Sequence, residues 1–374
     1  MSESKETKPE TQTGSTSALP ATDSHIQLYS KFYTQACLIP KDVKEAPEEM
    51  KKRDQRILIT LETITKLIFG SDGKKKARVV LYAGGALELI VALVKRSGVL
   101  NVKNIDNNGS DQAEMSKKII LSALKSIKTC VLRNPAGRAR CRSSGALGMI
   151  SNVFELCMME QHATIVEEAF TTLAAMSLGD DLNALEASTE MKPFIKASKE
   201  VFPNASQMHQ KTLYLDTLFA AIEKEQASFI KYLKSDNSMA AFFKNIIEAE
   251  KNKMTALHHV EDKKFSAALQ HFNHSIKLVA PFLDKTKLLD DIVMDIRSNR
   301  ASANSEVGNS KMCLEDTNIL LNVDGIDKRE LLKIHGKALI DLGRIEEGKE
   351  TLAKLRIMSP DDNEVMDILN GLKL

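Results

Sequence analysis

The stretch DIRSNRASANSEVGNSKMCLEDTNILLN, residues 295–322, decides the fold, because it encodes two short helices with one break between them. Its pattern predicts a first helix over 292–307 and a second over 310–321. Gly308 and the asparagine after it form the break, since these two residue types best tolerate the left-handed conformation that ends a helix. Small residues such as Cys313 lie where the helices must approach closely. A helix pair of this length is the unit of a helical solenoid.

The same pattern occurs on both sides of this stretch, around Ala268 and around Gly348. Cys313 follows Ala268 by 45 residues and precedes Gly348 by 35 residues, and Gly343 then corresponds to Gly308. Three consecutive helix pairs are therefore predicted. They would begin near Ala249, Met294 and Arg329.

These three units resemble tetratricopeptide repeats. The segment 361–372 is similar to the solvent-facing capping helix that such arrays need. The resemblance implies an all-α solenoid over residues 249–374 that offers a peptide-binding groove. The sequence departs from the family at Ser310, where an aromatic anchor is usual nearby, and in the long spacing between the first two units.

A second repetition, with longer units, occupies residues 25–248. Apolar residues recur at positions i, i+3, i+4 and i+7, as in amphipathic helices. The predicted helices are 57–70, 82–94, 119–133, 143–154, 166–179, 188–198, 212–224 and 236–247. The runs KKKARVVLYAGGALELIVALV (74–94) and NPAGRARCRSSGALGMISNVF (134–154) resemble armadillo repeats, in which a short helix and a glycine precede the second helix. The later units fit a HEAT-like description equally well.

The join between the two arrays is expected near residues 237–253, where the apolar pattern continues without proline or glycine. This continuity predicts a stiff helical junction and not a flexible linker. The first 24 residues are rich in Ser, Thr, Glu, Lys and Pro, so a disordered tail is expected over 1–24.

Composition agrees with stacked helices and excludes several classes of function. Hydrophobic residues make up 43% of the chain, aromatics only 5%, and tryptophan is absent. The net charge of +2 gives no overall attraction to nucleic acid or membrane. The five cysteines are scattered without CxxC spacing, which indicates reduced thiols in a cytosolic or nuclear protein, and a cytoplasmic location is expected. No apolar run is long enough for a membrane span, so no membrane partner is expected.

The second array also resembles the three-repeat modules that bind the C-terminal tails of cytosolic heat-shock chaperones. In those modules Lys, Asn and Arg side chains hold a terminal carboxylate by charge-assisted hydrogen bonds. The alignment carries these clamp positions onto Lys253, Leu257, Asn299, Glu330 and Ile334. Two of them keep a suitable side chain and three do not, and a glutamate repels a carboxylate ligand.

The peptide-binding groove is therefore predicted at Lys253 and Asn299, with Lys333 and Lys337 as neighbouring lysines that partly compensate for the lost donors. The alternative for Asn299 is a hydrogen bond to the neighbouring repeat, because polar groups inside helical stacks usually satisfy other polar groups.

A basic ridge is the second candidate site. Four arginines crowd one turn region, namely Arg133, Arg138, Arg140 and Arg142. They predict either a surface for an acidic partner, RNA or phosphate, or a solvated corner between helices. The absence of interleaved aromatic residues favours the solvated corner, so nucleic acid is not an expected partner.

Catalytic and cofactor chemistry is not indicated. His258 and His259 are adjacent and point to different faces of a helix, and no cysteine lies near them, so no metal site is predicted. No phosphate-binding loop, nucleophile elbow or HExxH motif occurs.

Three hypotheses of function remain open. The first is a non-catalytic scaffold or adaptor whose two arrays each bind a protein or peptide. The second is a co-chaperone that binds a heat-shock chaperone tail through the degenerate clamp. The third is an RNA- or acidic-partner-binding protein that uses the arginine ridge. An enzyme with a cofactor is the least supported class.

Overall fold

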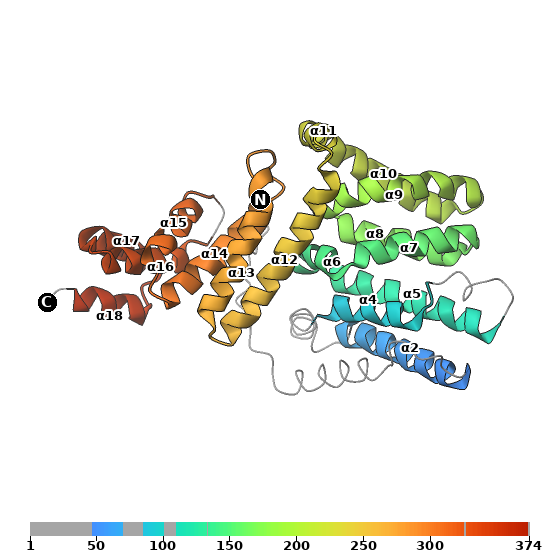
Figure 1. Ribbon diagram of the computed structural model, residues 1–374, viewed down its shortest axis with the longest axis horizontal. Coiled ribbons are helices and arrows are strands. Elements are labelled where there is room, and N and C mark those ends of the chain that lie inside the picture. Colours follow the sequence, from blue (N-terminus) through green and yellow to red (C-terminus); the bar gives the residue numbers. More distant parts are fainter. Residues whose placement is uncertain (1–46, 70–84, 101–109, 133, 325–326, 373–374) are drawn as a thin grey trace, which may run out of the picture.

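The computed structural model describes residues 47–69, 85–100, 110–132, 134–324 and 327–372. Over these ranges the chain consists of helices joined by turns, and it contains no strand (Figure 1). The predicted all-α helical solenoid is confirmed. None of the described helices is long and apolar enough to cross a membrane. The predicted disordered tail over 1–24 lies outside the described residues.

The first array stacks its helices in two layers. One layer contains α2, α5, α8 and α10, each in contact with the next, and the other contains α4, α7 and α9 (Figure 1). The short α6 contacts both layers, and α11 follows α10. The helices are α2 (Pro47–Phe69), α4 (Ala86–Ser97), α5 (Asp111–Val131), α6 (Pro135–Ser144), α7 (Ala146–Met159), α8 (Ala163–Ser177), α9 (Asp181–Val201), α10 (Ser206–Glu225) and α11 (Ala227–Ser235).

The core of the first array is continuous from α2 to α10. It is built mainly from Leu, Ile, Val, Ala and Met side chains, as the scarcity of aromatic residues predicts. The few aromatic side chains lie where the layers meet, and the ring centroids of Phe154 and Phe170 are 4.4 Å apart. Both rings are fully buried.

Helix α5 begins earlier than the pattern predicts. The polar run after residue 97 indicates a loop as far as residue 116, but α5 begins at Asp111. The hydroxyl of Ser110 accepts a hydrogen bond from the backbone N–H of Ala113, which satisfies one free donor of the first turn. The capping hydrogen bond of Ser110 thus stabilises a helical turn in a polar segment that the pattern assigns to a loop.

The second array consists of helix pairs followed by one terminal helix. Its members are α12 (Met239–Glu261), α13 (Phe265–Val279), α14 (Asp290–Glu306), α15 (Ser310–Leu321), α16 (Arg329–Asp341), α17 (Ile345–Met358) and α18 (Asn363–Gly371). A 3-10 turn, Ala280–Phe282, follows α13. Within each pair the two helices pack along their length, and α18 packs against α17 (Figure 1).

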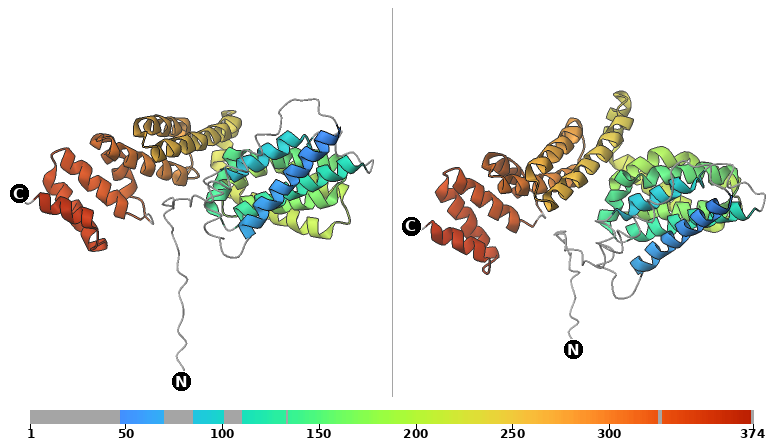
Figure 2. Two further views of the ribbon diagram at one scale, coloured as in Figure 1. Left: turned by 90° about the horizontal axis from the view of Figure 1, so that it is seen from below. Right: turned by 60° about the horizontal axis from the view of Figure 1, so that its bottom comes forward.

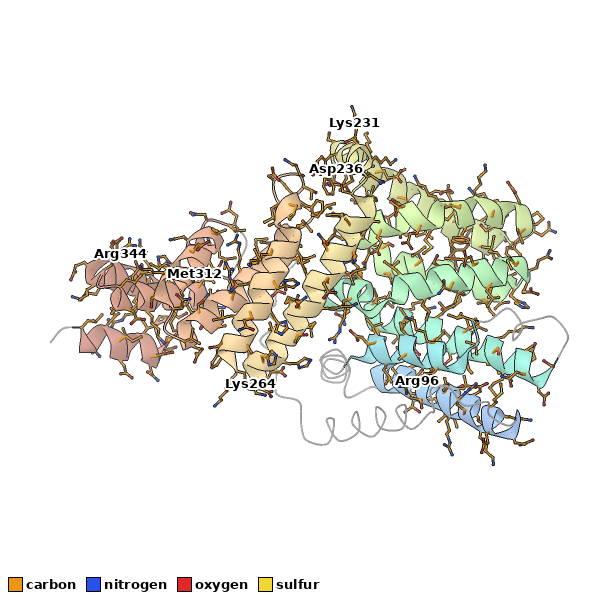
Figure 3. The ribbon with its side chains drawn as sticks, in the orientation of Figure 1. Arg96, Lys231, Asp236, Lys264, Met312 and Arg344 are labelled. Atoms are coloured by element: carbon orange, nitrogen blue, oxygen red, sulfur yellow. The ribbon has the colours of Figure 1, made fainter. Side chains whose placement is uncertain are left out.

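The same turn joins the two helices of every pair in the second array. Lys263, Gly308 and Gly343 adopt left-handed φ angles of 58°, 70° and 79°. In each turn the next residue donates its backbone N–H to a carbonyl five positions earlier, at 2.7–2.9 Å, which closes the helix in a Schellman motif. Figure 3 labels two of these donor residues, Lys264 and Arg344. These turns repeat at intervals of 45 and 35 residues, as the aligned small residues predict.

Close approach within the third helix pair depends on two glycines. A Cβ atom on Gly336 would lie 2.7 Å from the Leu352 side chain, and one on Gly348 would lie 2.6 Å from Ile340. The third pair therefore needs a residue without a Cβ atom at Gly348, whereas the larger Ala268 and Cys313 fit at the corresponding positions of the other two pairs.

Helix α12 belongs to both arrays. Its first half places Phe242, Phe243 and Ile246 against residues of the first array, including Leu185 and Phe229, in one shared core. Its second half pairs with α13, where the Ser275 hydroxyl donates to the carbonyl of Ala249 at 2.8 Å. The predicted domain boundary between residues 248 and 249 thus falls inside an unbroken helix. Figure 2 shows α12 between the two arrays.

Replacing Lys263 with glycine is expected to stabilise the protein by about 1 kcal/mol, because a non-glycine residue in the left-handed region carries a steric cost of that order. The free energy of unfolding, measured by chemical denaturation, tests this. Lys264→Gly is the matched control, since the neighbouring residue has a φ of −93° and gains nothing from glycine. If both substitutions changed the free energy of unfolding equally, this would contradict the left-handed conformation of Lys263 in the turn.

Candidate functional site

The first half of the predicted groove lies where α12 faces α14. The ammonium of Lys253 is 2.6 Å from Oδ2 of Asp295. The Asn299 amide donates to both the carbonyl and Oδ1 of Asp295, at 2.8 and 3.0 Å. The structure therefore brings the two retained clamp residues together, but around a carboxylate that belongs to the chain itself.

The second half lies where α16 faces the start of α18. Lys333 lies 3.4 Å from Asp362 and 3.2 Å from Glu364, and Lys337 donates to the other oxygen of Glu364. Hydrogen bonds from Lys337 and then Lys333 hold the pKa of Glu364 below its ordinary value. Asp362 also caps α18 by accepting from the backbone N–H of Val365. The cations of this half are neutralised by the capping helix.

The three clamp positions without a donor differ in their surroundings. Ile334 is 5% exposed and belongs to the core between α15 and α16. Leu257 is half-buried and packs against the core shared by the arrays. Glu330 is exposed and lies 3.4 Å from Lys333 on its own helix. Ile334 is therefore a core residue and does not line the groove.

The predicted arginine ridge is not presented to solvent as one surface. The Arg140 side chain is 14% exposed and donates to Glu88 of α4 at 2.8 Å. Arg138 reaches back to the carbonyl of Val131. Arg142 is buried, and Arg133 lies outside the described residues. The three described arginines contact neighbouring helices, so a ridge of free cations is not the arrangement found.

Arg142 is the centre of a charged cluster at the junction of the arrays. One guanidinium nitrogen donates to Asp180 at 2.6 Å and to Asn183 at 2.9 Å, and another donates to Glu250 at 2.7 Å. Asp180 caps the start of α9, and Glu250 lies midway along α12. Through Arg142, α6 is therefore bonded to α9 and to the helix that the arrays share.

The Asn183 amide completes this cluster by donating to the backbone carbonyls of Arg138 and Met176 at 2.8 and 3.0 Å. Asn183 is fully buried. Its hydrogen bonds fix the acceptor oxygen toward Arg142, which orients the guanidinium. No local pattern predicts this cluster, because Arg142 and Glu250 are 108 residues apart in the chain.

A second buried arginine connects the helix pairs of the second array. Arg300 on α14 makes a two-pronged contact with Asp316 on α15, with both distances 2.7 Å, and also donates to Asn273 on α13. Arg297 adds a further bond to Asp316, which is fully buried. These bonds hold three successive helices in register.

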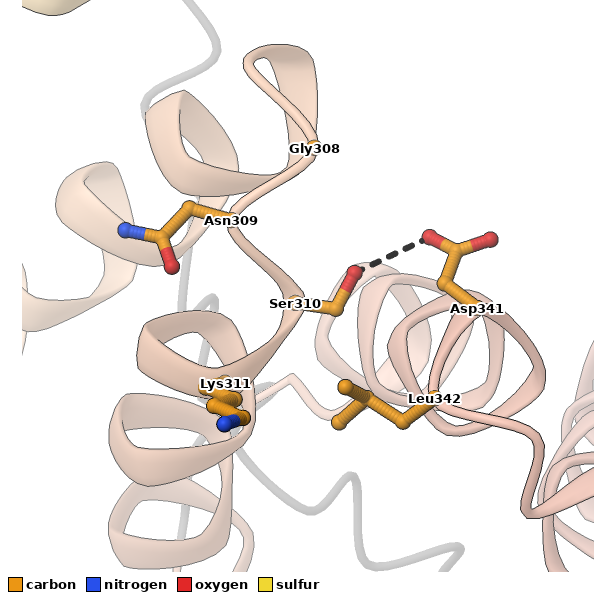
Figure 4. Close-up of a pocket in the computed structure, with 6 residues that line it drawn as sticks. All are labelled: Gly308, Asn309, Ser310, Lys311, Asp341 and Leu342. Carbon is orange, nitrogen blue, oxygen red and sulfur yellow. Dashed lines mark hydrogen bonds between the residues drawn. The ribbon is translucent and has the colours of Figure 1, made fainter.

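A shallow depression lies between the second and third helix pairs (Figure 4). It is lined by Gly308, Asn309, Ser310, Lys311, Asp341 and Leu342. The hydroxyl of Ser310 donates to Asp341 at 3.1 Å across it. This bond joins α15 to α16 at the position where the family usually has an aromatic anchor nearby.

Four histidines lie on α12 and α13. The rings of His259 and His271 stack with centroids 5.4 Å apart, and His271 contacts the Asn252 amide oxygen. Within the described ranges, no three His, Cys, Asp or Glu side chains converge in a geometry that could hold a metal ion.

Comparison with known proteins adds little to this geometry. No protein-family model and no curated protein matches the chain. Among solved structures, the tetratricopeptide-repeat domain of P58(IPK) aligns with 94% of this chain and 97% of that chain, at 12% identity and a TM-score of 0.30. A likeness this low carries no assignment. The repeat geometry itself defines the class: an all-α solenoid of two arrays, the second built from helix pairs.

Replacing Arg142 with methionine is expected to lower the free energy of unfolding by about 3–5 kcal/mol, because the buried Glu250 and the partly buried Asp180 lose the cation that they share. Adding Glu250→Gln should recover part of this loss, since one unpaired charge is removed. Denaturant titration of the single and double variants measures both effects.

The control for this experiment is Lys199→Met on α9, which breaks an exposed pair with Asp216 and should cost about 1 kcal/mol or less. If the Arg142 variant loses no more stability than this control, the junction does not depend on the buried cluster.

Proposed function

We propose that this chain is a non-catalytic scaffold that holds two proteins or peptides, one on each array, at a fixed relative orientation. The observation that carries this proposal is α12, which runs unbroken from the core of the first array into the first pair of the second. Because the arrays share this helix and its core, their surfaces do not move as independently tethered domains would.

The surface of the first array that favours a protein partner is the layer of α2, α5, α8 and α10. Apolar side chains are exposed at its two edges, with Ile59 on α2 and Leu213 on α10 at 56% and 63%. Between them, Lys128 pairs with Glu168, and Lys211 pairs with Glu167. Mixed charge with exposed apolar groups is typical of protein interfaces and not of nucleic-acid surfaces. We also propose that the first array is an armadillo-like repeat domain.

The co-chaperone function is the second candidate, favoured by the contact between Lys253, Asp295 and Asn299. These side chains already arrange a carboxylate between an ammonium and an amide. An incoming tail carboxylate would have to displace Asp295, and at α16 it would have to displace Glu364. Binding of a heat-shock chaperone tail therefore requires that the ion pairs of Asp295 and Glu364 break first.

A cytoplasmic location forms part of the same proposal. Cys141, Cys157 and Cys313 are buried free thiols. Disulfides are rare in the reducing cytoplasm, and buried thiols behave there as small apolar side chains.

Cross-linking with mass spectrometry on the full chain tests the scaffold proposal. The intact protein is needed because a cut near residue 249 would divide a shared core. Leu213→Asp should remove cross-linked partners of the first array alone, and Asn299→Ala should remove partners of the second. Ile357→Asp is the control, since this side chain is 82% exposed on α17, away from both surfaces. Partners lost equally from all three variants would contradict two separate surfaces.

An acidic chaperone tail peptide is expected to bind the full chain more weakly than about 1 μM. Each charge-assisted hydrogen bond contributes about 1.5–3 kcal/mol, and here the lysines must first lose their internal partners. Calorimetry with the peptide measures the affinity. Glu364→Gln should strengthen binding by freeing Lys337, while Glu346→Gln on α17 is the matched control that should not. Micromolar binding that Lys253→Ala or Asn299→Ala abolishes would establish the co-chaperone function instead.

A further inference from the structure

The cluster around Arg142 contains one more carboxylate than its hydrogen bonds require. Glu186 lies on α9, one helical turn beyond Asn183, and its side chain is buried with 7% exposure. One carboxylate oxygen of Glu186 and one of Glu250 are buried without a hydrogen-bond partner among the described residues. The junction thus holds three acidic side chains, Asp180, Glu186 and Glu250, around a single guanidinium.

Charge balance decides the state of Glu186. Asp180 and Glu250 already share the positive charge of Arg142, so an ionised Glu186 would be a buried charge without a partner, which costs several kcal/mol. Burial raises the pKa of Glu186 to about 7, Glu190 on the same helix adds to the shift, and Arg142 opposes it.

The groups facing Glu186 come from all three helices of the junction. Arg142 belongs to α6, Asp180 and Glu190 to α9, and Glu250 to α12, where Lys253 also acts on Glu250. Burial raises the pKa of Glu250 as well, although its bond to Arg142 acts in the opposite direction. Arg142 already pairs with Asp180 and Glu250, so it compensates the charge of an ionised Glu186 only in part.

We propose that Arg142, Asp180, Glu186 and Glu250 form a pH-dependent latch between the two arrays. With Glu186 protonated, α12 stays packed against α6 and α9 around Glu250. Ionisation of Glu186 favours local opening of this contact, in which water reaches the carboxylate. The two arrays are thereby coupled more tightly at acidic than at neutral pH.

The direction and the pH range follow from linkage. The pKa of Glu186 in the closed latch, about 7, lies above the ordinary value of 4.5 that applies once water reaches it. The stabilisation is therefore fully present below the ordinary value and is lost as pH rises through about 7. Opening should become up to about tenfold more frequent per pH unit within this range and should level off above it.

The backbone amides of α12 around Glu250 report this opening, because they exchange with solvent faster once the contact with α6 and α9 opens. The amides of α15, which lies within the second array and away from the junction, serve as the internal reference.

The test uses the full chain and amide hydrogen exchange, followed by peptide mass spectrometry from about pH 5 to pH 8. Each exchange rate is divided by that of the denatured chain at the same pH, which removes the intrinsic pH dependence of exchange. The normalised rate of α12 should rise steeply up to about pH 7 and then level off, while that of α15 should not change.

Two variants separate the latch from general effects of pH. Glu186→Gln keeps the shape of the neutral side chain and should make the normalised exchange rate of α12 independent of pH. Glu200→Gln, an exposed position on the same helix, should retain the wild-type profile. An α12 rate that is flat in the wild type, that keeps its slope in Glu186→Gln, or that changes in parallel with α15 would overturn the proposal.

Discussion

The structure depends on one buried guanidinium, that of Arg142. It lies where α6, the start of α9 and the middle of α12 meet, and it is the only side chain in this cluster that carries a positive charge. Buried ion pairs add little net stability, because desolvation cancels much of the attraction, but removing one partner leaves an uncompensated charge. A cluster of this kind acts chiefly as a specificity device, because a packing of α12 that separates Glu250 from Arg142 removes a hydrogen-bonded partner from both charges.

The second array uses the same device on a smaller scale. Arg300 reaches across to Asp316 and Asn273, so three consecutive helices share one planar, multi-donor group. Apolar packing between helices tolerates sliding, because one leucine can replace another in a groove. A guanidinium with fixed bond directions does not, which explains why a chain with few aromatic anchors can still have a defined helix register.

The fold could be predicted largely from local signals. The turns at Gly308 and Gly343, the small residues at fixed spacing, and the absence of helix breakers near α12 are all readable within a few residues. The sites could not be predicted in this way. The sequence groups Arg142 with the arginines next to it in the chain, although its partners lie on distant helices. It also predicts a groove at Lys333 and Lys337, although α18 folds back to pair with them. Charge pairing is a property of three-dimensional proximity, which the periodicity of a solenoid sequence does not encode.

Because α12 is continuous, the number of residues in it also sets the rotation of the second array relative to the first. An α-helix turns by about 100° and advances by about 1.5 Å per residue. One residue inserted between Ile246 and Ala256 would therefore swing the whole second array around the first by more than a quarter turn. A flexible linker tolerates insertions and deletions, but a change in the number of residues in this helix changes the angle between the two arrays. The length of α12 should thus be as strictly constrained as the chemistry of any side chain that it carries.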